Sequence, residues 1–458
     1  MKCAFVFFAA VCSFGASTTA WEMNTYSDFL RGKFQGLSLS RDGRLMLAPK
    51  LDTLFASDQP AVWSVVRGPG SSFYAATGHR GKVYLVESGA KSSVYWSSPQ
   101  PEIFALAVDA SGVLYAGTSP DGKIFRIENG KATEYFDPKA KYIWALQFDS
   151  KGTLYAGVEG GKVLRITAAG KGEVFYETGQ AHVVSLAFDT QGRLLAGTEP
   201  NGILYRIIEK DKAFVLYDSS LPEIRSMTST ADGSIYAVAL GGSLANRGSG
   251  WTTPVSASPG GIQVPTTTTT ITVTEDSAQA GLEVKPKADT NKPAQPVAQV
   301  TAQISPALDV SGVEKSAIYR IHPDNTVETL WSSKEENAYD ILNVGDYVVF
   351  STDTQGRIYR LSADRKVTLL AQTNEGEAVR LLRDGTSVIA ATSNLGKLYR
   401  LGDGFSTSGS YEAPVHDSNS VARWGRLQAR VDTCTGCSVS FRTRSGNSAR
   451  PDKTWSDW

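Results

Sequence analysis

The chain has 458 residues and carries 46 basic and 46 acidic side chains, so its formal net charge at pH 7 is zero. A neutral chain has no overall field that would draw it onto nucleic acid or an anionic membrane, and we expect no nucleic-acid partner. The 43 glycines and the apolar fraction of 41% are typical of a turn-rich all-β protein.

The chain begins with the features of a secretory signal peptide. Met1-Lys2 supplies one positive charge, an apolar run follows, and small residues lead up to Ala20. This run is too short for a retained membrane span, so we expect cleavage after Ala20 and a mature chain without a transmembrane segment. A lipid anchor at Cys12 is a less favoured alternative, because Val11 stands where a small residue is expected. Residues 1–20 therefore predict an extracytoplasmic protein, either secreted or periplasmic.

A unit of about forty residues repeats along most of the chain. Residues Glu102–Pro138 return in similar form from Tyr142 and again from His182. Each copy holds four short runs of alternating apolar, β-branched and aromatic residues, separated by turn-forming pairs such as Asp-Gly, Ser-Gly and Asn-Gly. Four short antiparallel strands at this period describe one blade of a β-propeller.

Seven copies are found when Phe104 is taken as the reference position in the first strand. The equivalent positions are Trp63, Phe104, Trp144, Val184, Arg225, Tyr339 and Val379. Neighbouring positions are about forty residues apart, except that the step from Arg225 to Tyr339 holds roughly seventy more. The sequence therefore predicts a seven-bladed β-propeller over residues 51–403.

The two ends of the propeller are predicted to meet in its last blade. The unit around Val379 supplies three strands but no fourth, whereas residues Leu51–Ser57 match the fourth strands of the interior blades. We expect this N-terminal strand to complete the last blade, which removes exposed sheet edges from the ring. The preceding N-terminal segment, residues 21–50, contains a hairpin-like stretch from Leu37 to Ala48 that has no place in this scheme.

Two stretches depart from the repeat. Residues 241–314 are rich in Gly, Ser, Thr and Pro and poor in large apolar side chains, so we expect a disordered insertion. A small β element around residues 270–273 is the alternative. The insertion follows a second strand, so it leaves the rim that carries the loops between second and third strands. Residues 408–458 resemble the opening strands of a β-sandwich appended to secreted bacterial propellers, and are too few for a complete one.

Cys434 and Cys437 lie in a predicted hairpin turn of this last stretch, and Cys3 and Cys12 are expected to leave with the signal peptide. A Cys-x-x-Cys pair beside a βαβ pattern indicates redox chemistry, but here the context is all-β. A single pair is also weak support for a zinc site. We therefore expect a local disulfide between Cys434 and Cys437.

Other positions belong to the repeated frame of the blades. Six of seven third strands carry the same basic residue, namely Arg126, Arg165, Arg206, Arg320, Arg360 and Arg400. We expect each to lay its stem along a neighbour and to pair its guanidinium, with Asp109, Asp149 and Asp189 as candidate partners. We assign Phe104, Tyr115 and Arg126 to this frame. The small residues in runs such as Tyr115–Thr118 are expected to permit close approach where blades converge.

Candidate ligand-binding residues gather at one rim of the predicted propeller. The loops that join successive blades, and those between second and third strands, surround the same mouth of the central channel. The side chains there vary while the frame repeats, as a specific site requires and as neutral drift would also produce. The candidates are Glu102, Asp121, Tyr142, Glu159, His182, Glu199, Glu223, Asn337 and Glu377.

Enzyme motifs are absent from the sequence. There are only four histidines, with no HExxH spacing, no GxSxG elbow and no phosphate-binding glycine loop, so we expect no cofactor and no metal site. Two propeller enzyme families are similar in residue types alone. Sugar-lactone lactonases hold a divalent cation with Glu, Asn and Asp ligands, which Glu102, Glu223, Asn337 and Glu377 imitate. Streptogramin-lyase-like propellers use a histidine and a glutamate, which His182 and Glu223 imitate.

The blade pattern, with its runs FALAV, VLYAGT, KIFRI and TEYF, resembles secreted bacterial propeller repeat proteins of the WD-repeat-like and NHL-like class over residues 51–403. The resemblance implies an extracytoplasmic scaffold that offers one rim to a protein, peptide or glycan. We therefore favour a non-enzymatic binding protein. The alternatives are a cation-dependent lactonase- or lyase-like enzyme and a structural propeller whose C-terminal sandwich binds the ligand, since a propeller fold alone specifies no activity.

Overall fold

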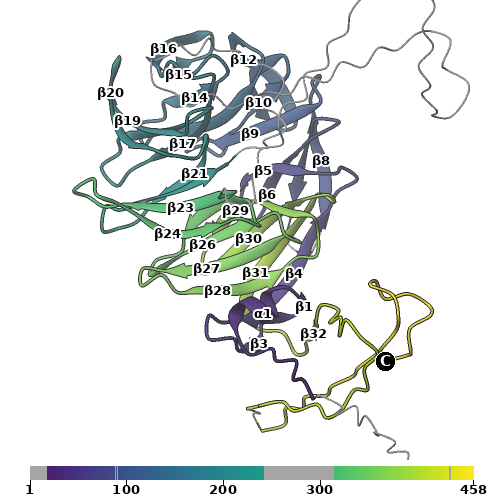
Figure 1. The fold of residues 1–458 in the computed structure, drawn as a ribbon. Coiled ribbons are helices and arrows are strands. Elements are labelled where there is room, and N and C mark those ends of the chain that lie inside the picture. Colours follow the sequence, from purple (N-terminus) through teal and green to yellow (C-terminus); the bar gives the residue numbers. More distant parts are fainter. Residues whose placement is uncertain (1–17, 88, 90, 242–313, 433–434) are drawn as a thin grey trace, which may run out of the picture. The chain divides into compact units, whose positions relative to one another are not determined.

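The computed structural model describes residues 18–87, 89, 91–241, 314–432 and 435–458. The predicted signal peptide up to residue 17, and the predicted disordered insertion between residues 241 and 314, lie outside the described residues. One short helix, α1 (Tyr26–Leu30), precedes a series of β-strands (Figure 1). The all-β prediction is confirmed. Among the described residues no helix is long and apolar enough to cross a membrane.

Five blades are built from consecutive antiparallel strands. The first blade comprises β5 (Val62–Arg67), β6 (Phe73–Thr77), β7 (Lys82–Val86) and β8 (Ser92–Ser97). The second comprises β9 (Glu102–Val108), β10 (Leu114–Ser119), β11 (Gly122–Glu128) and β12 (Lys131–Ala140). The third comprises β13 (Ile143–Phe148), β14 (Leu154–Val158), β15 (Lys162–Ala168) and β16 (Lys171–Glu177). The fourth comprises β17 (His182–Phe188), β18 (Leu194–Glu199), β19 (Ile203–Glu209) and β20 (Lys212–Asp218). The fifth comprises β21 (Glu223–Ser229), β22 (Ile235–Leu240), β23 (Ser316–Ile321) and β24 (Val327–Ser333).

The last two blades also recruit N-terminal strands. The sixth comprises β25 (Ala338–Asn343), β26 (Tyr347–Thr352), β27 (Arg357–Ser362) and β28 (Val367–Gln372), and it is extended by β2 (Leu37–Leu39) and β3 (Leu45–Leu47). The seventh comprises β29 (Glu377–Asp384), β30 (Ser387–Ser393), β31 (Lys397–Phe405) and β4 (Pro49–Ala56). A separate two-stranded sheet pairs β1 (Lys33–Gln35) with β32 (Ser410–Glu412).

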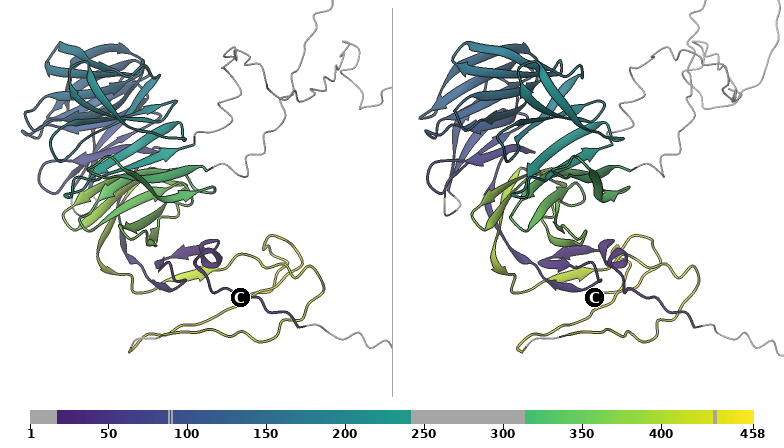
Figure 2. Two further views of the ribbon diagram at one scale, coloured as in Figure 1. Left: turned by 60° about the vertical axis from the view of Figure 1, so that its left-hand side comes forward. Right: turned by 90° about the vertical axis from the view of Figure 1, so that its left-hand side faces the viewer.

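The seven sheets form a closed ring, which Figure 2 shows from two further sides. Each first strand contacts the first strands of both neighbouring blades, and β29 of the seventh blade contacts β5 of the first. The first strands therefore surround the central channel, and the seven-bladed prediction is confirmed.

Small residues in the second strands allow the blades to pack this closely. A Cβ atom on Gly117 would lie 2.5 Å from Cγ2 of Ile143 in the next blade, and one on Gly157 would lie 2.7 Å from the carbonyl oxygen of Val183. No real side chain tolerates such contacts without a shift of the neighbouring strand. The small residues of the Leu/Tyr-Ala-Gly-Thr runs therefore permit the close approach of neighbouring blades, as expected.

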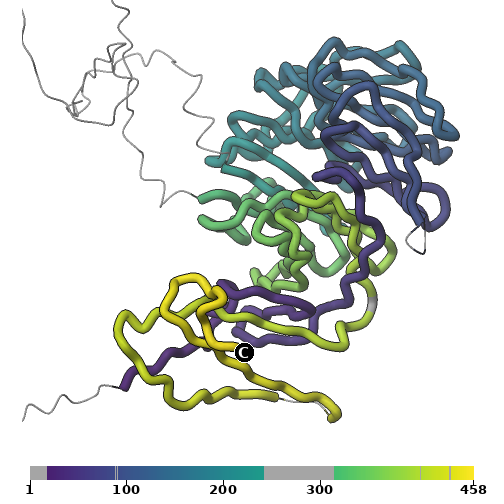
Figure 3. Tube along the Cα trace, turned by 90° about the vertical axis from the view of Figure 1, so that its right-hand side faces the viewer, coloured from purple at the N-terminus to yellow at the C-terminus, as the bar shows by residue number. Residues whose placement is uncertain are grey.

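Strand β4 closes the ring, as the sequence predicted. It pairs antiparallel with β31, with Phe55 opposite Leu398 and Asp52 opposite Arg400. Figure 3 shows this N-terminal segment, in purple, running beside the yellow-green strands of the last blade. Phe55 is buried, and its ring lies 4.8 Å from that of Tyr84 in the first blade. The closing strand thus joins the last blade to the first through apolar packing.

The N-terminal segment also covers the outer edge of the sixth blade. Leu39 of β2 pairs with Leu369 of β28, and the Ser38 hydroxyl donates a 2.6 Å hydrogen bond to the carbonyl oxygen of Leu370. The hairpin from Leu37 to Ala48, which the sequence left without a place, therefore covers the edge of a blade. Covering an edge in this way prevents pairing with another chain.

A buried ion pair fixes helix α1 to the same blade. Arg357 and Glu336 are both buried, with 2.5 Å between Nη1 and Oε1, and the Tyr359 hydroxyl donates to Glu336 at 2.9 Å. Arg357 also donates a 2.6 Å bond to the carbonyl oxygen of Leu30 at the end of α1. At the other end of the helix, Thr25 and Asp28 form a reciprocal capping box.

The third-strand arginines make the structural contacts expected of them, although two of their partners differ from the candidates. Arg206 pairs with Asp189 at 3.3 Å as expected. Arg126 pairs with Glu128 instead, and Arg165 pairs with Glu173 and lies over the ring of Phe175. The other two candidates serve turns: the carboxylates of Asp109 and Asp149 accept backbone N–H groups two and four residues further on.

The C-terminal segment contributes one strand among the described residues. That strand is β32, and it pairs with β1 rather than with another strand of its own segment. The sandwich therefore stays a prediction. Several large apolar side chains of this segment are exposed, including Val421, Trp424, Leu427, Val439, Phe441 and Trp458. Cys437 is disulfide-bonded, and Cys434, its predicted partner, lies outside the described residues.

Candidate functional site

Every first strand of the propeller contains a β-bulge at the same position. The pairing with the second strand shifts by one residue there, which leaves one extra residue in the first strand. These bulge residues are Trp63, Phe104, Trp144, Val184, Arg225, Tyr339 and Val379. A bulge re-aims a side chain that would otherwise point to one face of the sheet. The seven bulges therefore place one varied residue per blade along the inner strands that surround the channel.

Three consecutive bulge residues form an aromatic arc across the first three blades. The ring centroids of Trp63 and Phe104 are 5.8 Å apart, and those of Phe104 and Trp144 are 5.0 Å apart. Tyr142, two residues before Trp144, stacks on it with centroids 5.0 Å apart and an interplanar angle of 15°. All four side chains are half-buried, and each ring packs against at least one other ring of the group.

The residue two positions before each bulge is here called the entry residue, and the set is Ala61, Glu102, Tyr142, His182, Glu223, Asn337 and Glu377. Bulge and entry residues together define the channel mouth. The indole N–H of Trp63 donates to Glu102 at 2.7 Å, and the Tyr339 hydroxyl donates to Glu377 at 3.2 Å. In both cases a bulge residue holds the entry residue of the next blade. These two bonds connect the first blade to the second and the sixth blade to the seventh.

His182 follows the same rule and is held neutral. The indole N–H of Trp144 donates to His182 Nδ1 at 3.1 Å. Burial lowers the pKa of His182 below its ordinary value, against the opposing effect of the Glu159 and Glu223 carboxylates. A neutral imidazole that accepts at Nδ1 carries its hydrogen on Nε2. His182 therefore presents Nε2–H as a hydrogen-bond donor, while its unprotonated nitrogen, Nδ1, is occupied by the Trp144 N–H.

Glu199, Glu223 and Arg225 form a charged group beside His182. Arg225 Nη1 lies 3.1 Å from Glu223 Oε1, and only 12% of the Glu223 side chain is exposed. Burial lowers the pKa of the Arg225 guanidinium, but the Glu223 carboxylate outweighs this effect and raises it. Burial and the Glu223 charge raise the pKa of Glu199. Arg225 is thus engaged with Glu223, and the Glu199 carboxylate has no hydrogen-bond partner among the described residues.

The remaining carboxylates of the mouth are held by neutral donors. Asp353, in the loop after β26, accepts the side-chain amide of Asn337 at 2.7 Å and its backbone N–H at 3.0 Å. Glu377 also accepts the hydroxyl of Ser393. Burial, and then the charges of Glu377 and Asp353, raise the pKa of Tyr339 above its ordinary value. Tyr339 therefore stays protonated and acts as a donor.

The structure brings Glu159, His182, Glu199 and Glu223 close together, and eight of the nine predicted site residues share an intermediate burial. Glu102, Tyr142, Glu159, His182, Glu199, Glu223, Asn337 and Glu377 are all half-buried. Glu159 forms an isolated bridge with His182, and its carboxylate accepts the backbone N–H of Lys141. Asp121 is the exception, because it is exposed and only its backbone carbonyl takes part, accepting the hydroxyl of Thr118.

Sequence reasoning missed the bulge residues as functional candidates. Phe104 was assigned to the repeated frame, whereas its ring contacts both Trp63 and Trp144 in the arc. The sequence does contain a sign of their role, because the residue at the bulge position differs between blades. It is Trp, Phe, Trp, Val, Arg, Tyr and Val in turn. A frame position would show the same residue from blade to blade, as the third-strand arginine does.

Residues that imitate the lactonase and lyase sites make other contacts in this structure. Among the residues that the structure describes, no group of three or more His, Cys, Asp or Glu side chains is placed to hold a metal ion. Glu223 is paired with Arg225, and Asn337 is bonded to Asp353. These contacts give no specific support to a cation site.

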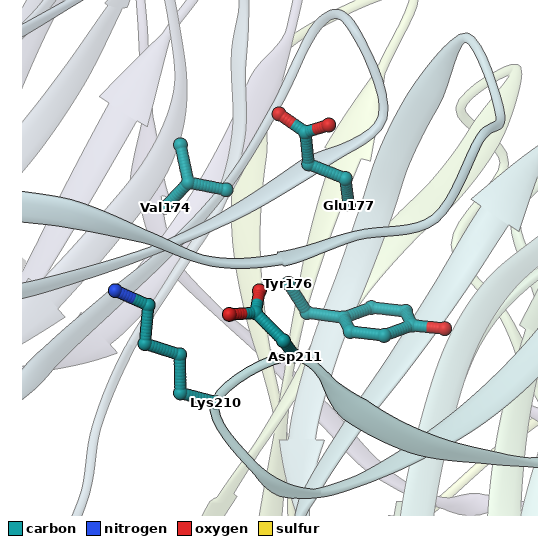
Figure 4. A pocket seen from close by; sticks show the side chains of 5 residues that line it. All are labelled: Val174, Tyr176, Glu177, Lys210 and Asp211. Carbon is teal, nitrogen blue, oxygen red and sulfur yellow. The ribbon is translucent and has the colours of Figure 1, made fainter.

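One surface hollow lies away from the mouth (Figure 4). It has a volume of about 450 Å³ and is lined by Val174, Tyr176, Glu177, Lys210 and Asp211, which belong to outer strand β16 and to the turn before β20. Lys210 is already paired with Glu173 at 2.7 Å. We therefore place the candidate site at the channel mouth and not in this hollow.

Comparison with known proteins supports the fold. No protein-family profile matches the sequence, and no curated protein matches it. Among solved structures, virginiamycin B lyase from Staphylococcus aureus aligns with a TM-score of 0.53 and 13% identity, over 77% of this chain and 98% of that chain. The WD40 β-propeller domain of Doa1 aligns with a TM-score of 0.50 and 12% identity, over 77% of this chain and 96% of that chain. The extracellular domain of the hybrid two-component system BT3049 from B. thetaiotaomicron aligns with a TM-score of 0.50 and 11% identity, over 78% and 42%. The structural neighbours are thus β-propeller proteins.

Proposed function

We propose that this chain is an extracytoplasmic, non-enzymatic binding protein that holds a protein, peptide or glycan at the channel mouth. One observation carries the proposal: seven bulges place a varied set of side chains, five of them half-buried and two buried, on an otherwise repeated frame. Rigid frames with variable side chains at one mouth are common in ligand recognition. Aromatic side chains supply contact area at low cost in side-chain entropy.

An extracytoplasmic location is supported by two independent features. Residues 1–20 have the pattern of a signal peptide, and the bonded Cys437 suits an oxidising compartment. One structural neighbour, named above, is itself an extracellular domain. Fusing residues 1–20 to a reporter that is active only outside the cytoplasm tests the location. An inactive reporter would contradict it.

An array of peptides and glycans probed with the full chain tests the binding role. The decisive variant is Trp144→Ala, which removes the centre of the aromatic arc. The matched control is Trp96→Ala, because Trp96 is also half-buried and packs on an aromatic ring, but it lies in outer strand β8. We expect Trp144→Ala to lose binding to the array spots that the wild type binds, and Trp96→Ala to keep it. Equal binding by the wild type and Trp144→Ala would refute a site at the mouth.

The same array separates this proposal from the third hypothesis, in which the C-terminal segment binds the ligand. Trp424 is 56% exposed in that segment and is the natural variant to compare. Binding that survives Trp144→Ala and disappears in Trp424→Ala would move the site out of the propeller.

A further inference from the structure

We infer that the channel mouth recognises positive charge, and that its ligand is an arginine-containing stretch of peptide. This inference rests on the proposed function and names the chemistry of its partner. It is carried by two features of the mouth: a row of half-buried aromatic rings, and three carboxylates, those of Glu102, Asp353 and Glu377, that pair with no Arg or Lys side chain among the described residues.

The aromatic arc offers platforms for a planar cation. Trp63, Phe104 and Trp144 follow one another around three blades at centroid spacings of 5.8 and 5.0 Å. The face of an aromatic ring attracts a cation within about 6 Å, and tryptophan is the strongest such ring. A guanidinium group also stacks flat on these faces, which an ammonium group does not. The arc therefore favours arginine over lysine.

Three carboxylates of the mouth accept their hydrogen bonds from neutral groups. Glu102 accepts the indole N–H of Trp63 and the backbone N–H of His79, and the His79 imidazole is its nearest basic group, with Nδ1 3.8 Å from Oε1. Glu377 accepts two hydroxyls, and Asp353 accepts two N–H groups of Asn337. Neutral donors orient a carboxylate and leave its charge available to a ligand.

Several carboxylates in other parts of the propeller pair with arginine, although those of Asp109 and Asp149 accept backbone N–H groups. Asp189 pairs with Arg206, Asp232 with Arg320, and Asp384 with Arg400, each through a direct ion pair. Among the described bulge and entry residues, Arg225 is the one Arg or Lys, and it pairs with Glu223. Other basic residues, such as Arg80 and Lys141, are exposed on loops of the same rim.

The spread of these groups favours a peptide over a small cation. Glu102 belongs to the second blade, whereas Asp353 and Glu377 belong to the sixth and seventh, and the aromatic arc covers the first three. A single small amine would contact only one part of the channel mouth. An extended chain with more than one arginine can place a guanidinium on the arc and another near the carboxylates of the later blades. A neutral glycan would leave those charges buried beneath it without compensation.

The test measures the affinity of the full chain for three short, end-capped fluorescent peptides by anisotropy. One peptide contains arginines, the second has citrulline in their place, and the third has glutamate. Citrulline keeps the shape and loses the charge. We expect the arginine peptide to bind at least about tenfold more tightly than the citrulline peptide, and the glutamate peptide not to bind. Rising salt should weaken the arginine complex.

Two substitutions connect the affinity to the mouth. Glu102→Gln keeps an acceptor for Trp63 and removes the charge, and Trp144→Ala removes a platform; we expect each to weaken the arginine peptide by roughly threefold to tenfold. Glu134→Gln is the matched control, because Glu134 is exposed on outer strand β12 and pairs with Lys123. It should leave the affinity unchanged. A circular dichroism melt of each variant confirms that it is folded.

The possible outcomes separate this inference from the proposed function. Equal binding of the arginine and citrulline peptides, lost in Trp144→Ala, would overturn the inference and leave the mouth as the binding site. Arginine-peptide binding that survives both Glu102→Gln and Trp144→Ala would also overturn it. An arginine peptide that fails to bind, together with neutral glycans that bind the wild type and not Trp144→Ala, would replace the peptide with a glycan.

Discussion

Replacing Phe55 with alanine tests whether β4 holds the propeller closed. Phe55 is 5% exposed, and it packs with Leu398 of the last blade and with Val62 and Tyr84 of the first. Truncating a buried phenylalanine costs about 3–5 kcal/mol. An unfolding entropy of about 2.1 cal/mol/K per residue over roughly 300 propeller residues corresponds to about 0.6 kcal/mol/K. We therefore expect the Tm to fall by about 5–8 °C.

A melt followed by circular dichroism measures this shift, and two variants control for it. Phe214 also lies in a fourth strand but is 49% exposed, so Phe214→Ala should shift the Tm by only about 1–2 °C. Phe175 is buried in the fourth strand of an interior blade, so Phe175→Ala should match the Tm loss of Phe55→Ala. Only Phe55→Ala should speed amide hydrogen exchange in β31. Unchanged exchange there, or equal shifts for Phe55→Ala and Phe214→Ala, would refute the closing role.

Three further predictions concern charge and packing. Because the pKa of Glu199 is raised above 4.5 in the folded state, its protonated form stabilises the fold at low pH, and this contribution is lost as the pH rises through the folded pKa. Glu199→Gln should therefore raise the Tm at neutral pH and have no effect well below pH 4.5; a gain that persists at low pH would contradict this. Arg357→Ala leaves Glu336 buried without its cation, so we expect the free energy of unfolding in urea to fall by about 3–5 kcal/mol. Adding Glu336→Gln should recover much of this loss. A loss under about 1 kcal/mol for Arg357→Ala alone would count against the buried pair. Gly157→Ala meets the carbonyl oxygen of Val183 at 2.7 Å and should lose about 1–3 kcal/mol in the same assay, and a neutral result would show that the blades can separate there.

The fold was predictable because each blade is a local pattern repeated seven times. Alternation and turn residues identify strands, and the match of Leu51–Ser57 to other fourth strands identified the closing partner of β31. The hairpin β2–β3 was not predictable in the same way. It joins β28 at a single residue pair, Leu39 with Leu369, and no repeat marks that contact.

The candidate site was predictable only in outline. Entry residues such as Glu102 and His182 were found because they are polar at loop positions of a repeat. Bulge residues were missed because a bulge depends on backbone register, which residue type does not reveal, and a large aromatic such as Trp144 is read as core. The hydrogen bond from Trp144 to His182 connects two blades, so no single copy of the repeat shows it.

The assignment of arginine partners failed for a related physical reason. Asp109 and Asp149 stand near the third-strand arginines in the repeat, but each carboxylate satisfies backbone N–H groups of its own turn. Local side-chain to backbone bonds compete well with longer contacts, because they fix fewer rotatable bonds. Arg126 and Arg165 therefore pair with acidic residues on strands of the same blade.

The most direct test of a ligand site at the channel mouth is fluorine NMR of the full chain, with its 9 tryptophans replaced by 5-fluorotryptophan. Trp63→Phe and Trp144→Phe identify the two resonances of the mouth. On titration with the arginine peptide, we predict that these two resonances shift in a saturable manner, while those of Trp96 and Trp331 on outer strands do not. Shifts confined to Trp424, Trp455 and Trp458 would contradict the account, because they would place the ligand on the C-terminal segment.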